Sequence, residues 1–116
     1  MGLDMGLNRN GEEVGYWRKA NQIREWFVNH LDDFNDEGDT KITEENCEDL
    51  LETCKEVLAD HDKAPELLPT SIGFFFGSQE YDEYYFEDLA DTVEILENVL
   101  KSTDWDMDEV VYWESY

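Results

Sequence analysis

Carboxylates are the side chains with which this sequence could do chemistry, and they recur at helical spacing in two segments. Residues three and four apart on a helix lie about 5–6 Å from each other, so acids at these intervals form a row along one face. In segment 78–100 the row comprises Glu80, Glu83, Glu87, Asp91 and Glu94. In segment 43–60 it includes Glu48 and Glu52. Such rows predict a surface that competes for a nucleic-acid-binding groove.

The plain alternative for these rows is a solvated helix face without a partner. Solvated faces usually mix charges of both signs, and like charges at these spacings cost stability. Here the chain has 31 acids against 8 bases and a net charge of −23, and residues 1–31 are neutral, so the excess lies in residues 32–116. With so large an excess of acids, a partner-binding surface and a solvated helix face are equally good interpretations of these rows.

The net charge also restricts the class of partner. Binding to nucleic acid depends on lysine and arginine neutralising phosphates, so we expect no direct binding to nucleic acid and none to an anionic membrane. A basic protein surface would instead be attracted over a long range. The expected partner is a basic nucleic-acid-binding host protein.

The segment between the first two expected helices nearly matches the calcium-loop template, which needs oxygen ligands at alternate positions, a glycine and a closing glutamate. Its candidate ligands are Asp33, Asn35, Glu37 and Glu44. Glu37 is longer than the usual aspartate or asparagine, and Thr40 replaces the usual apolar residue. A small calcium- or ligand-binding module that uses this acidic loop, residues 33–44, is the alternative function, and otherwise we expect no cofactor.

Other side chains that commonly do chemistry are few. Cys47 and Cys54 are seven residues apart, about 10 Å along a helix, which is too far for a disulfide, so we expect buried reduced thiols. His30 and His61 end expected helices, where they suit the helix dipole. No catalytic motif is present, and we expect a binding protein rather than an enzyme. A weaker alternative is an enzyme with a pocket near Tyr16, Arg18 and residues 74–76.

The elements that must position these residues form an α+β domain. We expect three main helices and a small sheet of two to three antiparallel strands formed near the termini. The expected strands are 2–8 and 110–113, and the expected helices are 14–31, 43–60 and 78–100. Residues 32–42 read as a polar loop, and 73–77 as a short apolar strand or loop. We expect residues 1–116 to form a single acidic globular domain.

Several stretches resemble a family of small phage and prophage proteins. They are Met1–Met5, Val14–Asn21, Trp26–Val28, Leu67–Thr70, Gly73–Ser78 and Tyr81–Tyr84. The resemblance spans nearly the whole chain and implies an accessory protein of the bacterial host cytoplasm. By analogy with other small acidic phage proteins, it implies an inhibitor of host defence, such as an anti-CRISPR or anti-restriction protein.

The sequence therefore predicts an inhibitor of a nucleic-acid-handling host protein such as a CRISPR or restriction effector. The two acidic helices would supply attraction. Exposed aromatic side chains such as Tyr84 would supply specificity, because interfaces favour tyrosine and tryptophan. No apolar run reaches membrane-spanning length, and no signal pattern opens the chain, so we expect a soluble cytoplasmic protein.

Overall fold

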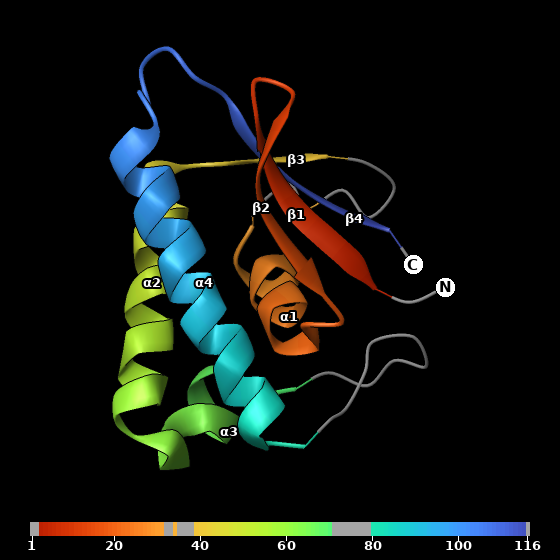
Figure 1. Ribbon diagram of the computed structural model, residues 1–116, viewed down its shortest axis with the longest axis vertical. Helices are drawn as coiled ribbons and strands as arrows, with labels where there is room; N and C mark the ends of the chain where they lie inside the picture. The colour runs from red at the N-terminus through yellow and green to blue at the C-terminus, as the bar shows by residue number, and fades with distance from the viewer. Residues whose placement is uncertain (1–2, 32–33, 35–38, 71–79, 116) are drawn as a thin grey trace.

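The computed structural model describes residues 3–31, 34, 39–70 and 80–115, and it confirms the mixed α+β class. Four antiparallel strands form one sheet in the order β2-β1-β4-β3, and helices pack to one side of it (Figure 1). The strands are β1 (Asp4–Arg9), β2 (Glu12–Arg18), β3 (Thr40–Ile42) and β4 (Val110–Ser115). The helices are α1 (Asn21–His30), α2 (Glu44–Ala59), the 3-10 turn η1 (His61–Lys63), α3 (Ala64–Leu67) and α4 (Glu83–Ser102).

The strand expected near the N-terminus is β1, and the expected closure of the fold by the last strand is confirmed. Leu3, Met5 and Leu7 alternate with more polar neighbours and are all 0% exposed, so one face of β1 lies in the core. β1 pairs antiparallel with β4 from Asp4 opposite Ser115 to Arg9 opposite Val110. The two ends of the described chain therefore lie side by side (Figure 1).

The helix expected over 14–31 is wrong in its first part. Residues Glu12–Arg18 form β2, which pairs back onto β1, and α1 begins only at Asn21. Asn10 and Gly11 both have positive φ, which suits the tight turn that joins two strands of a hairpin. Lys19 also has a positive φ of 58°, so the chain turns sharply between β2 and α1.

The polar loop expected over 32–42 contains a further strand at its end. Thr40–Ile42 form β3, which pairs with Val110–Tyr112 of β4. Ile42 is 2% exposed, because the pairing directs its side chain into the core. Over the described residues, the sheet therefore has four strands rather than the expected two or three.

The second expected helix is confirmed and the third begins later than expected. Thr43 caps α2 through a capping box with Asn46. α4 begins at Glu83, and the Asp82 side chain caps it by accepting from the Tyr85 N–H. Residues 78 and 79, where the third helix was expected to begin, and the 73–77 run lie outside the described residues. No helix among the described residues is both long and apolar enough to cross a membrane.

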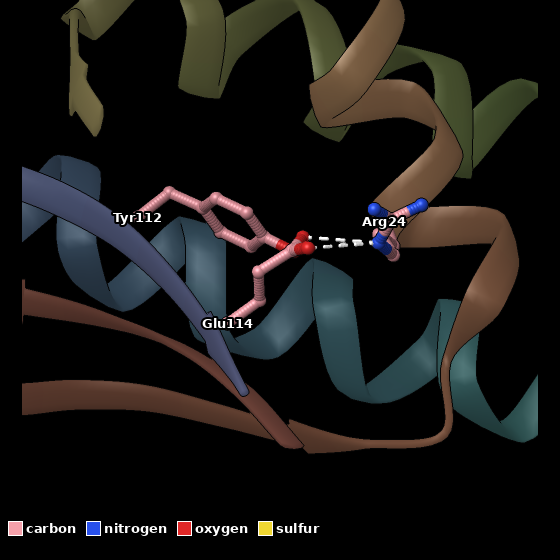
Figure 2. Close-up of polar contacts among 3 residues, drawn as sticks. All are labelled: Arg24, Tyr112 and Glu114. Carbon is pink, nitrogen blue, oxygen red and sulfur yellow. Dashed lines mark hydrogen bonds and ion pairs between the residues drawn. The ribbon is translucent and has the colours of Figure 1, made fainter. Parts of the chain in front are cut away.

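A buried ion pair joins α1 to the end of β4. Arg24 Nε lies 3.0 Å from a carboxylate oxygen of Glu114, and the Tyr112 hydroxyl donates to the same carboxylate at 2.9 Å (Figure 2). The Glu114 side chain is only 1% exposed and that of Arg24 14%. Phe27 of α1 stacks on Tyr112 with ring centroids 4.2 Å apart, so the ion pair borders the aromatic part of the core.

Candidate protein-binding surface

The acidic surface, defined as the exposed carboxylates of α2 and α4, lies on two helices that pack side by side (Figure 1). Lys55 of α2 pairs with Glu97 of α4 at 3.7 Å, and His61 stacks on Phe86 at 3.7 Å. The later residue of the α2 side, His61, contacts the earlier residue of α4, Phe86, so the two helices run antiparallel. Their buried sides hold Cys47, Leu50, Cys54, Val57, Leu89, Leu96 and Val99.

Every acid that the sequence assigned to the two rows is exposed. α4 carries Glu83, Glu87, Asp91 and Glu94 on its outward side, and α2 carries Glu48 and Glu52. Glu80 is exposed as well, but it precedes α4 instead of lying on it. The structure therefore places six of the seven acids on the α2–α4 pair.

The density of charge on this pair approaches that of a nucleic-acid strand. Each helix carries six acids and a single lysine. The 20 residues of α4 extend about 30 Å, so the net charge of the pair is roughly one per 3 Å, against one per 3.4 Å along a DNA strand. Cations offset little of it: in the described residues, ion pairs reach these acids only from Lys55 to Glu97 and from Lys63 to Glu56.

Tyr84, the predicted aromatic anchor, is 67% exposed at the start of α4. It lines a cleft of about 300 Å³ between the β2–α1 turn and the first turns of α4. The lining residues are Arg18, Lys19, Asn21, Gln22, Glu80, Asp82, Tyr84, Tyr85 and Asp88. The sequence does not predict this cleft, because no local pattern indicates the sharp turn that brings Arg18 and Lys19 to α4.

Asp88 is the unusual carboxylate of the cleft. Burial raises its pKa to about 6, and the nearby Asp91, Glu87 and Asp82 add to that rise, whereas a hydrogen bond from Gln22 opposes it. The Gln22 bond is long, with Nε2 3.4 Å from the carboxylate. Asp88 is therefore a half-buried acid with little to stabilise its charge.

The pocket suggested for the enzyme alternative is not assembled as expected. Arg18 lines the cleft, but Tyr16 does not, and its ring instead lies 6.4 Å from that of Trp113. Residues 74–76 lie outside the described residues. Cys47 and Cys54 are buried and free, as expected, and burial raises the pKa of each thiol to about 12. Neither thiol is a nucleophile at neutral pH.

The two histidines contact aromatic rings, and His30 also contacts the backbone. His30 lies at the end of α1, its ring stacks on Trp26, and Nδ1 lies 2.8 Å from the Trp26 carbonyl oxygen. His61 lies in η1, directly after α2, and stacks on Phe86.

Of the four predicted calcium ligands, only Glu44 lies in the described part of the chain. It is exposed in the first turn of α2, where an acid suits the helix dipole. Asp33, Asn35 and Glu37 lie outside the described residues, so the loop stays a prediction. Within the described ranges, no group of three or more metal-ligating side chains is close enough to hold a metal ion.

A second set of carboxylates, at Asp104 and Asp108, stabilises the turn before β4. The two oxygens of Asp108 accept hydrogen bonds from the Asp104 N–H at 2.9 Å and from Asn10 Nδ2 at 2.8 Å. These bonds hold the pKa of Asp108 below its usual value. This cluster has a structural role in fixing the turn against the β1–β2 hairpin.

Comparison of this chain with protein-family models, with curated proteins and with solved structures finds no match.

Proposed function

We propose that this chain binds a basic, nucleic-acid-handling protein and occupies its nucleic-acid site with the acidic surface of α2 and α4. The partner class that best fits is a host defence effector, such as a CRISPR or restriction nuclease, in a bacterial cytoplasm. The chain acts as an inhibitor by competing with nucleic acid for the same lysines and arginines. No catalytic step is part of this function.

The observation that supports the proposal most is the charge density of the helix pair. Acids at roughly one net charge per 3 Å on a rigid, packed scaffold present phosphate-like charge without the cost of ordering a flexible chain. Tyr84 at one end adds an exposed aromatic ring next to the acids, and aromatic rings are frequent energetic anchors in interfaces.

Capture of partners from a bacterial lysate tests the proposal. The immobilised protein is exposed to lysate with and without excess duplex DNA, and retained proteins are identified. The proposal predicts a nucleic-acid-binding protein that DNA displaces. Retention that DNA leaves unchanged contradicts competition at a nucleic-acid site.

Matched variants separate the acidic surface from net charge. The surface variant replaces Glu83, Glu87 and Glu94 with Gln and Asp91 with Asn. The control variant makes the same change in charge at four other exposed acids, Asp62, Glu66, Asp106 and Glu109. The surface variant is expected to lose capture and the control to keep it. Equal losses would mean that overall charge, and not this surface, drives binding.

A further inference from the structure

Strand β2 lies at one edge of the sheet, with a side that no described strand covers. The Lys19 N–H donates to the Leu3 carbonyl at 2.7 Å. Hydrogen-bonded pairs alternate along an antiparallel ladder, so the backbone groups of Tyr16 and Arg18 point away from β1. In the described part of the chain, no backbone hydrogen bond satisfies them.

The cleft lined by Tyr84 and Asp88 lies at the Arg18 end of this edge. Side chains of an added strand would alternate between the two faces of the sheet. Those on the core face would point toward α4, which packs against that face of β2. The cleft lining holds three acids, Glu80, Asp82 and Asp88, against two bases, Arg18 and Lys19, so acids outnumber bases around a cation placed there. Tyr84 offers an exposed ring beside them.

Charge decides which extended chain fits this edge. A second copy of this protein would bring another net charge of −23, and the two would repel each other. A lysine- or arginine-rich segment would instead be attracted by the acids of α4 next to the edge. Glu12 and Glu13 at the start of β2 are exposed and extend this acidic environment along the strand.

We propose that the free edge of β2 receives an extended basic segment of a partner protein as a fifth strand, with one arginine or lysine of that segment in the cleft beside Asp88. The inference rests on the proposed function, because it assumes the same basic partner. Backbone pairing supplies part of the affinity, and the cleft selects a cationic side chain.

A short peptide tests the pairing directly. The probe is a blocked seven-residue peptide that alternates arginine and valine, with arginine at both ends. Its control has the same sequence with every backbone nitrogen methylated, which keeps the charge and removes the donors. In amide NMR spectra at low salt, the first peptide should slow hydrogen exchange at Tyr16 and Arg18, and the methylated peptide should bind at least tenfold more weakly.

Two variants complete the test. Tyr16→Pro removes an N–H that points away from β1 and breaks no backbone bond to β1, but it also removes the hydroxyl that donates to the Asp4 side chain. Tyr16→Phe, which loses the hydroxyl and keeps the N–H, is therefore its control, and the thermal midpoints of both variants check that the fold survives. Tyr16→Pro should weaken peptide binding by about tenfold, which corresponds to the free energy of about one hydrogen bond. Asp88→Asn should weaken binding of the peptide by a similar factor, whereas Asp106→Asn, at an exposed acid outside both the cleft lining and the acidic surface, should change it much less.

The failures of the two proposals are distinguishable. If both peptides bind equally and perturb only α2 and α4, the edge proposal is overturned and the acidic surface stands. If slowed exchange at Tyr16 and Arg18 grows with protein concentration without peptide, the occupant is a second copy, and the proposal is wrong. If neither peptide binds at low salt, both the edge and the attraction to basic chains are contradicted.

Discussion

Arg24 on the first helix and Glu114 near the end of the last strand form an ion pair at 3.0 Å, with the glutamate side chain 1% exposed (Figure 2). The pair connects segments that are 90 residues apart in sequence. A buried carboxylate needs a compensating partner, because transfer of an isolated charge out of water is very costly. The pair therefore ties the position of α1 to the register of β4.

Loss of the cation from this pair should be strongly destabilising. Arg24→Met should lower the free energy of unfolding by about 3 kcal/mol, because the Glu114 charge then has mainly the Tyr112 hydroxyl to stabilise it. The double variant Arg24→Met, Glu114→Met should recover part of the loss. Urea denaturation of the single and double variants measures both. A double variant less stable than Arg24→Met would contradict this account of the pair.

Asp88 should make the protein less stable as the pH rises. Its pKa is about 6 in the folded chain and roughly 3.9 when unfolded, so the folded state binds more protons between these values. This contribution to stability is present below the unfolded pKa and is lost as pH rises through the folded one. Asp88→Asn should therefore stabilise the protein by about 1 kcal/mol at pH 7, after discounting for partial exposure, and not at pH 3.5.

Asp91→Asn is the matched control for this effect, because it removes the same charge from an exposed position on the same helix. Denaturant unfolding from pH 3.5 to pH 8 should show a pH-dependent gain for Asp88→Asn that exceeds the gain for Asp91→Asn. Equal curves for the two variants would show that general repulsion among the acids, and not burial of Asp88, is responsible.

The buried thiols should report on unfolding. Because burial raises the pKa of Cys47 and Cys54 to about 12, few thiolates exist at pH 8 and neither side chain is accessible. A thiol reagent such as DTNB should react with the native protein much more slowly than with the urea-unfolded chain, by a factor of at least 100. Rapid reaction of either thiol under native conditions would contradict the core packing of α2.

Gly6 and Gly15 should not tolerate a side chain. A Cβ at Gly6 would lie 2.7 Å from the Gly15 carbonyl oxygen and 2.7 Å from Trp113 Nε1. At Gly15 it would lie 2.6 Å from a methyl carbon of Ile95, where α4 packs on β2. Each change to alanine should cost about 1–3 kcal/mol, the usual range for an overpacked core. Gly11→Ala has open space around it, so it separates crowding from the strain of a positive φ.

Sequence patterns predicted the elements whose signals are local. The strand expected over 2–8 is confirmed as β1, and Leu3, Met5 and Leu7 alternate with more polar residues. The helix expected over 43–60 is confirmed as α2, which Thr43 caps. The helix predicted around Trp17 was wrong, because the spacing of Trp17, Ala20 and Ile23 fits a helix although Trp17 lies in β2. The signal that could have corrected it was the Asn10–Gly11 turn, a two-residue hairpin sequence that predicts a returning strand over 12–18.

The candidate site was predictable only in part, for a related reason. Exposed acids follow from helical periodicity, so the positions of Glu87 and Asp91 could be read from the sequence. The pairing of α2 with α4, and the cleft that brings Arg18 to Asp88, depend on contacts between residues far apart in the chain. No local pattern encodes such contacts.

The most direct test of the central claim uses the captured partner loaded with fluorescent duplex DNA. Titration with this protein should release the DNA, and the surface variant at positions 83, 87, 91 and 94 should need at least tenfold more protein. The control variant at positions 62, 66, 106 and 109 should match the unmodified chain. A complex that holds both protein and DNA, or equal release by the two variants, would contradict the claim that the acidic surface occupies a nucleic-acid site.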